Sequence, residues 1–284
     1  MNRPEAVKHI IMQAGRGELV FPANVQASLQ IQRGLDDPTC SLETAAQLII
    51  AEPVLAARVV AIANSVAYSR FGGTVSNVRN AVSVLGFRTL QSIVAAIVIR
   101  QIGSGITDPK IQAKATQLWQ HSAQTASIAR SLAPYVGKID PETALFAGIV
   151  HAVGGFYLLS RAEEFPSLLE PQVAQHLDGV QAEEDLGTMV NHTILKKLMV
   201  PKEVREAIEF MDEGRSVLPP NTLGELLWLA RCLATTCTPF EGVAKLSEEQ
   251  KQACLDCELV GKTVAVHLQE SESTRASLLS ALVS

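Results

Sequence analysis

At three places in this sequence a proline stands at the start of an apolar segment and marks the expected start of a helix. They follow acidic residues, in Glu52-Pro53, Asp108-Pro109 and Asp140-Pro141. Proline fits a first helical turn because its φ angle is already set, and it pushes the residue before it out of helical geometry. At Asp140 the carboxylate can also cap free N–H groups. Apolar residues then recur at a spacing of three or four, which predicts helices.

The same reasoning, applied along the chain, predicts helices almost everywhere and no strand. Gly86 has the position of a glycine that ends a helix, and Gly154-Gly155 is expected to end or kink the helix that starts at Asp140. No segment alternates polar and apolar residues convincingly, and no repeat period is present. We therefore predict an all-α fold, with helices near 21–33, 42–51, 54–63, 77–86, 87–102, 110–133, 141–153, 182–198, 202–211, 223–236, 247–268 and 274–283.

The amino-acid composition is typical of packed helices, and the net charge disfavours nucleic acid as a partner. Hydrophobic residues make up 47% of the 284 residues and aromatic residues only 5%, which suits close helix packing. This length favours one large unit or two sub-bundles. The formal net charge is −5, and no cluster of Lys and Arg is long enough to follow a phosphate backbone, so nucleic acid is not an expected partner.

Neither export nor a membrane span is expected. Residues 1–17 mix charged and apolar side chains, unlike a signal peptide. The most apolar run, Ile93–Ile99, is far shorter than the roughly 20 residues that a span needs. We expect a cytoplasmic protein with reduced thiols. A zinc site is the alternative for the cysteines, but their spacing fits one poorly: Cys232, Cys237, Cys254 and Cys257.

Two histidines lie in apolar helical segments thirty residues apart. Helices joined by a short loop are commonly antiparallel neighbours, so the rings of His121 and His151 can face each other. Imidazoles favour transition metals, and a hydrolytic site would normally add carboxylates. Glu142 lies about 13 Å from His151 along the helix axis and cannot reach the same ion. A buried or partly buried pair of histidines is therefore favoured over a metal site.

Short motifs between residues 48 and 90 resemble a known family. They are Ile-x-x-Glu-Pro-x-Leu-Ala-x-Arg at Ile49–Arg58, Ala-Asn-Ser at Ala63–Ser65 and Ala-x-x-x-Leu-Gly at Ala81–Gly86. Together they resemble the HDOD domain, a relative of the HD-domain metal phosphohydrolases. The residues that carry this signature are Glu52, Pro53, Asn64, Ser65, Leu85 and Gly86.

The resemblance covers roughly residues 18–212 and implies an HDOD-type multi-helix bundle. Within it we expect an N-terminal helical sub-bundle over about 18–105 and an HD-like sub-bundle over about 106–212. The segment 213–284 is expected to supply C-terminal helices that pack on the HD-like part.

The resemblance also implies where a metal would lie in an HD-domain enzyme, held by a His, a His-Asp doublet and a later Asp. His121 resembles the first His and His151 the second, whereas Ala152 stands at the doublet's Asp and Arg231 at the last one. Both carboxylates are then missing, and a guanidinium would repel a divalent cation. We expect no metal and no other cofactor.

Other polar residues have structural interpretations. Asn64 can end a helix in left-handed geometry, and Arg88 can pair with an acidic group or remain solvated. His176 and His267 have no other candidate site residues near them in the sequence and are expected on the surface, whereas Trp119 is expected in the core.

The resemblance places the chain in bacterial signalling, as a non-catalytic regulatory module that binds a protein partner and can form a homo-oligomer. The helix from Gly86 to Gly103 is the expected partner surface because of its apolar run Ile93–Ile99, together with the C-terminal helices. Two alternatives stay open. One is a divergent metal-dependent phosphohydrolase that uses His121 and His151. The other is a sensor of a small anionic ligand such as a nucleotide, with Arg231 supplying the positive charge.

Overall fold

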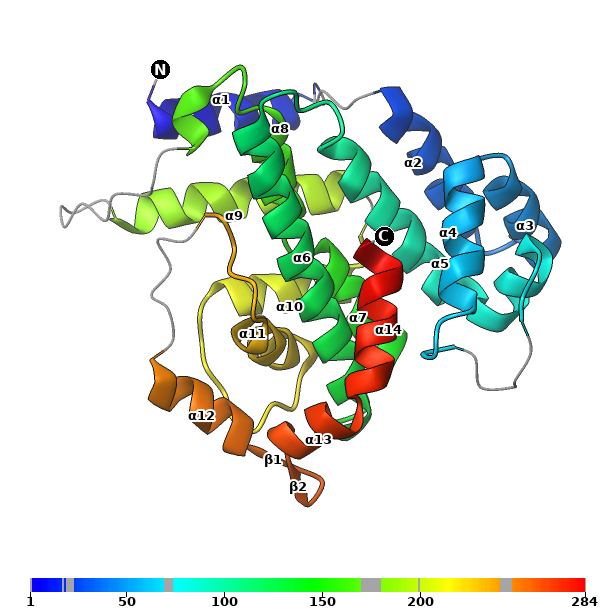
Figure 1. The fold of residues 1–284 in the computed structure, drawn as a ribbon. Helices are drawn as coiled ribbons and strands as arrows, with labels where there is room; N and C mark the ends of the chain where they lie inside the picture. Colours follow the sequence, from blue (N-terminus) through cyan, green and yellow to red (C-terminus); the bar gives the residue numbers. More distant parts are fainter. Residues whose placement is uncertain are drawn as a thin grey trace.

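Helices and their connecting turns make up the described part of the chain, apart from one short hairpin (Figure 1). The structure is a computed structural model that describes residues 2–16, 18, 23–68, 74–169, 180–198, 200–240 and 247–283. The prediction of an all-α fold is confirmed. The α-helices are α1 (Arg3–Gly15), α2 (Ala23–Asp36), α3 (Leu42–Ile50), α4 (Pro53–Ala63), α5 (Val78–Ile102), α6 (Pro109–Leu132), α7 (Pro141–Val150), α8 (Val153–Ser160), α9 (Val180–Lys197), α10 (Lys202–Asp212), α11 (Leu223–Leu233), α12 (Glu248–Asp256), α13 (Val264–Glu270) and α14 (Glu272–Val283), with the 3-10 turns η1 (Ala133–Tyr135) and η2 (Pro166–Leu169).

The first group of helices is organised around α5, which packs against α2, α3 and α4 and also against α7. Gly86 interrupts α5 with φ 72° and ψ 169°, a conformation that glycine adopts at little cost, so the predicted break at this residue is confirmed. Every side chain of Ile93–Ile99 is buried in the core. The prediction that this run forms a partner surface is therefore wrong, because a helix that is apolar all round is an interior helix.

The second group surrounds α6, the long helix at the centre of Figure 1. It packs against α7, α8, α11 and α14, while α9 and α10 close the group. The expected cap at Asp140 is confirmed, since its side chain accepts a hydrogen bond from the N–H of Thr143 at 2.9 Å. Trp119 lies in the core as expected.

Both ends of the chain pack on this frame. Helix α1, which the sequence pattern did not predict, packs against α9 and η2. Helix α14 contacts α6 and also α4 in the first group. Its last carbonyls accept hydrogen bonds from Arg58 (3.1 Å to Ala281) and from the Trp119 indole (3.3 Å to Leu282). The C-terminal helix is thus held by both helical groups.

The segment predicted as one helix over 247–268 contains a two-stranded antiparallel hairpin, β1 (Glu258–Leu259) and β2 (Lys262–Thr263). Val260 and Gly261 form its tip with positive φ angles of 49° and 78°. His267 follows the hairpin and is buried, with Nε2 2.8 Å from the carbonyl oxygen of Leu259 and its ring stacked on Tyr135. The prediction that His267 is exposed is wrong, because the hairpin returns the chain over it.

Among the described residues, two helical stretches are long and apolar enough to cross a membrane by length and composition alone, Val78–Ile102 and Pro141–Ser160. Both are mostly buried inside the fold, as the core helices of a globular protein are. Two of the predictions made above concern residues outside the described part of the chain: the start of the helix near 21–33, and His176.

Candidate functional site

The two predicted histidines do meet, on neighbouring helices. His121 lies on α6, His151 follows the last residue of α7, and their ring centroids are 5.6 Å apart in an edge-to-face arrangement. The approach of the helices depends on Gly148, because a Cβ atom there would lie 2.4 Å from the Cα of Ala126 on α6. The predicted juxtaposition of the two rings is confirmed.

Backbone carbonyls fix the proton on each ring. Nδ1 of His121 lies 2.7 Å from the carbonyl oxygen of Thr236, and Nδ1 of His151 lies 2.7 Å from that of Gly148. A carbonyl oxygen only accepts, so each Nδ1 carries the hydrogen and each Nε2 presents a lone pair. Nε2 of His121 is buried and has no hydrogen-bond partner in the described part of the chain.

Both rings are neutral at physiological pH. Burial lowers the pKa of His151 to about 3, and the neighbouring His121 and Arg231 act in the same direction. Burial also lowers the pKa of His121, and the charge of Arg231 lowers it further, whereas the hydrogen bond to the Thr236 carbonyl raises it. The site therefore offers two uncharged imidazoles.

A cavity of about 180 Å³ opens beside the histidines. Its walls come from α6, α8, α9, α10 and α11, together with Arg3 of α1 and the segment after α11. The side chains that determine its chemistry are His121, His151, Ala152, Thr188, Asn191, Asp212, Arg231 and Thr238.

A carboxylate that was not predicted from the sequence enters this cavity. Asp212 ends α10, and its Oδ1 lies 3.7 Å from Nη1 of Arg231. Burial raises the pKa of Asp212 to about 6, even though Arg231 and a hydrogen bond with Asn191 act to lower it. A signal for its burial was present in the sequence, because Asp212 stands four residues after Ile208, on the continuation of the buried stripe of α10.

Asn191 holds the break between α7 and α8 on which His151 sits. Its Oδ1 accepts a hydrogen bond from the N–H of Gly154 at 2.8 Å, and its Nδ2 donates to the carbonyl of His151 at 2.7 Å. A Cβ at Gly154 would lie 2.6 Å from the Cα of Asn191. Gly154 and Gly155 lie inside α8 and do not end the helix, contrary to our expectation. The break falls at His151 and Ala152.

The signature residues lie in the first helical group, and none of them lines the cavity. Glu52 caps α4 through a hydrogen bond to the N–H of Leu55, and Pro53 is the first residue of that helix. Asn64 has φ −85°, so the expected left-handed geometry is wrong. Its side chain instead bonds both the N–H and the carbonyl of Val75, at 2.7 and 2.8 Å. Ser65 and Leu85 are buried.

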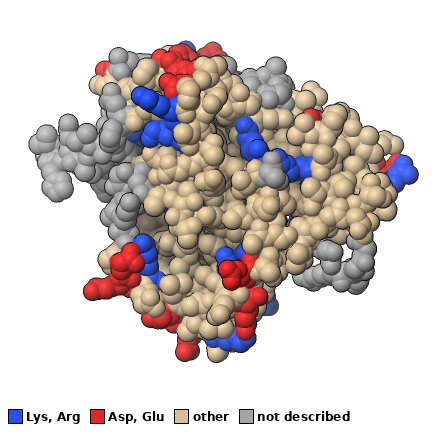
Figure 2. Space-filling view, viewed as in Figure 1, with Lys and Arg blue, Asp and Glu red and all other residues tan. Residues whose placement is uncertain are grey.

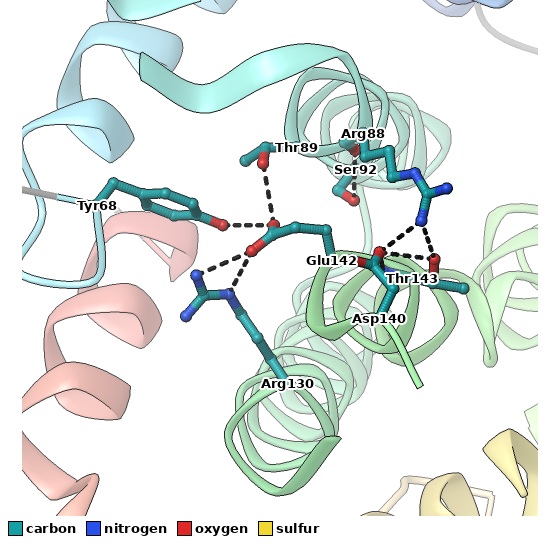
Figure 3. A network of polar contacts seen from close by, with 8 residues as sticks. All are labelled: Tyr68, Arg88, Thr89, Ser92, Arg130, Asp140, Glu142 and Thr143. Carbon is teal, nitrogen blue, oxygen red and sulfur yellow. Dashed lines mark hydrogen bonds and ion pairs between the residues drawn. The ribbon is translucent and has the colours of Figure 1, made fainter. Parts of the chain in front are cut away.

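A second polar cluster joins the two helical groups, and we call it the joint (Figure 3). Glu142 of α7 lies at its centre and accepts hydrogen bonds from the Tyr68 hydroxyl at 2.7 Å and from Thr89 at 3.0 Å. Arg130 of α6 donates to its other oxygen through Nε and lies 2.9 Å away through Nη2. Beside it, Arg88 of α5 pairs with Asp140 at 2.8 Å. Burial and the Glu142 carboxylate raise the pKa of Tyr68.

Comparisons with known proteins agree on the family. The family model described as HDOD domain matches residues 21–213. No curated protein matches the sequence.

Solved structures share the fold at low sequence identity. A protein of Shewanella amazonensis SB2B, provisionally named a metal-dependent phosphohydrolase, is 20% identical, with a TM-score of 0.71 over 98% of this chain and 99% of that chain. An HDOD domain protein of unknown function from Geobacter sulfurreducens is 20% identical, with a TM-score of 0.64 over 96% and 97%. A protein of Marinobacter aquaeolei VT8, provisionally named a signal transduction protein, is 21% identical, with a TM-score of 0.60 over 100% and 67%.

Proposed function

Because this chain belongs to the HDOD domain family, we propose that it is a non-catalytic regulatory module that binds a protein partner in a bacterial signalling pathway. The observation that carries the non-catalytic part is the guanidinium of Arg231 in the histidine cavity. It lowers the pKa of both rings by its charge and lies 3.7 Å from Asp212, the carboxylate that lines the cavity.

The residues of this cavity do not fit the divalent metal that a phosphohydrolase would use. Within the described ranges, no group of three or more His, Cys, Asp or Glu side chains could share an ion. A hydrolytic metal needs enough anionic or neutral ligands to replace its water, and a nearby cation opposes it. Arg231 and Asp212 cancel in charge, which leaves two neutral imidazoles to hold the ion.

The relatives' names point in two directions. The name of the Marinobacter aquaeolei protein supports a signalling role, whereas that of the Shewanella amazonensis protein supports hydrolysis of phosphate esters. The alternative is a metal-dependent phosphohydrolase. It is favoured by the lone pairs at Nε2 of His121 and His151, and by Asp212, which lines the same cavity. The two functions make opposite predictions for bound metal.

The first test is metal content together with turnover. We expect the purified full-length protein, incubated with Mn²⁺ and dialysed, to retain no stoichiometric metal and to hydrolyse neither phosphomonoesters nor cyclic dinucleotides. Stoichiometric metal, with hydrolysis that is lost in His151→Ala, would establish the phosphohydrolase and contradict this proposal.

The second alternative is a sensor of a small anion, and Arg231 in a cavity with Thr188 and Thr238 favours it. A ligand specific to the folded state raises its apparent stability. Thermal unfolding with a panel of nucleotides, compared between the wild type and Arg231→Gln, tests this alternative. A shift that depends on Arg231 would support the sensor, and no shift with any nucleotide would exclude the compounds tested.

The proposed partner is a protein, with no nucleic acid or membrane involved, and the proposed location is the cytoplasm. On the face shown in Figure 2, basic side chains lie in small separate groups, several of them beside acidic side chains, which supports this choice. Light scattering of the purified chain tests for a homo-oligomer. For a heterologous partner, a protein cross-linked to the chain in cells must also bind it when both are purified.

A further inference from the structure

A second cavity, of about 250 Å³, lies where the two helical groups meet. Its walls come from α2, α5 and α7 and from the first residues of α10. It shares no lining residue with the histidine cavity. Its lining residues are Gln32, Asp36, Arg88, Gln91, Glu142, Thr143, Phe146, Pro201, Glu203 and Val204.

Negative charge predominates in this second cavity. Three carboxylates and one guanidinium line it, which leaves two net negative charges. Two further charges lie directly behind the wall, Asp140 paired with Arg88 and Arg130 paired with Glu142. These two have opposite signs and cancel. Burial raises the pKa of Asp36, although a hydrogen bond from Gln91 opposes this, so the negative charge of Asp36 is incompletely compensated.

One amide side chain in the same cavity has no hydrogen-bond partner among the described residues. Gln32 is 6% exposed, and in the described part of the chain no hydrogen bond involves its side chain. Nε2 of Gln91 donates to Oδ1 of Asp36 at 2.8 Å, which leaves the carbonyl oxygen of Gln91 free to accept. Gln32 lines the cavity, so its amide oxygen can accept a hydrogen bond from a molecule bound there.

We propose that the second cavity binds a small organic cation with N–H donors, an amine or a guanidine. Its N–H groups would donate to Asp36, Glu203 and the free amide oxygens. Phe146, Val204 and Pro201 supply apolar wall for the carbon skeleton, as small-molecule sites commonly do. A bare metal ion fits less well, because no described group of three ligands could hold one.

A ligand at this place would touch both helical groups at once. Arg88 belongs to α5, whereas Thr143 and Glu142 belong to α7 and to the joint. Binding would therefore stabilise one arrangement of the two groups over others. This inference does not depend on the proposed function, because the second cavity is separate from the histidines.

The test uses the full-length protein and two defined probes, agmatine and putrescine. We expect at least one of them to bind with one-to-one stoichiometry in calorimetry and to raise the midpoint of thermal unfolding. Tetramethylammonium, which has the charge but no N–H donor, should do neither. Absence of heat and of a thermal shift with both probes would overturn the proposal, and so would equal binding of tetramethylammonium.

Variants locate the binding. Asp36→Asn removes one charge-assisted bond and should weaken binding about tenfold, whereas the matched control Asp37→Asn, one residue outside the cavity lining, should not. Glu203→Gln, at an exposed position, gives an independent reading if Asp36→Asn unfolds the chain. Wild-type affinity in both Asp36→Asn and Glu203→Gln would overturn the assignment to this cavity.

Discussion

Arg130 and Arg231 each lie beside a carboxylate inside the bundle, but their surroundings differ. At the joint, both oxygens of Glu142 are bonded, one by Arg130 and the other by Tyr68 and Thr89. In the histidine cavity, Arg231 stands 3.7 Å from Asp212, and Nε2 of His121 has no partner in the described part of the chain.

The difference separates a structural cluster from an open one. A buried polar network stabilises a fold when every member is bonded, and it costs free energy when members are left unpaired. The joint therefore holds the two helical groups together. The histidine cavity instead contains polar groups without hydrogen-bond partners in the described part of the chain, and a carboxylate with a raised pKa. The same carboxylate-to-amide substitution should have opposite effects at the two places.

The largest effect is expected at the joint. Glu142→Gln removes the charge that compensates the buried Arg130, so the free energy of unfolding should fall by roughly 3 kcal/mol. Urea unfolding followed by circular dichroism measures this. The control is Glu43→Gln, which breaks the exposed pair with Arg79 and should cost less than about 1 kcal/mol. Equal losses in the two variants would contradict a structural role for the joint.

A smaller effect on the free energy of unfolding is expected when the pH is lowered, because of His151 in the histidine cavity. His151 has a folded pKa of about 3 against an ordinary value of 6.5, so below pH 6.5 the unfolded chain binds a proton that the folded chain refuses. Stability should therefore fall as the pH drops from about 6.5 towards 3, by about 2 kcal/mol near pH 5 from this ring alone. Unfolding curves of the wild type and His151→Gln at several pH values test this. The same acid sensitivity in His151→Gln would assign it to other groups.

The smallest effect has the opposite sign to that at the joint. Asp212 has a folded pKa of about 6, above its ordinary 3.8, so its ionisation on going from about pH 4 to pH 6 favours the unfolded chain. Asp212→Asn removes this cost, which the difference between the two pKa values puts at about 3 kcal/mol, but it also places amide N–H donors beside the Arg231 guanidinium. The net result should be a stabilisation of about 1 kcal/mol near pH 7.5. Thermal and urea unfolding at that pH are the measurements. A loss as large as that of Glu142→Gln would mean that the Arg231 pair is structural as well.

Local signals predicted most of the fold. The cap at Asp140, Pro53 at the start of α4 and the break at Gly86 depend only on neighbouring residues, and all are found. The meeting of His121 and His151 followed from the short connection between their helices.

What failed depended on tertiary packing. Asp212 enters the cavity because of how α10 packs on α9 and α11; the local pattern places it on the buried face of α10 but not beside the two histidines. His267 is buried by a hairpin whose signal is two residues, Val260-Gly261. The run Ile93–Ile99 is a different case, because a seven-residue apolar run with no polar face is typical of the core, so the sequence itself argues against a partner surface there.

The central claim is that Ala152 and Arg231 leave the histidine cavity unable to hold a catalytic metal. Equilibrium dialysis against Mn²⁺ with the wild type and with Ala152→Asp/Arg231→Asp tests it most directly, after circular dichroism shows that both are folded. The wild type should bind no stoichiometric Mn²⁺, whereas the double variant, with two added carboxylates and no guanidinium, should bind about one ion per chain. Stoichiometric binding by the wild type, lost in His121→Ala, would contradict the account.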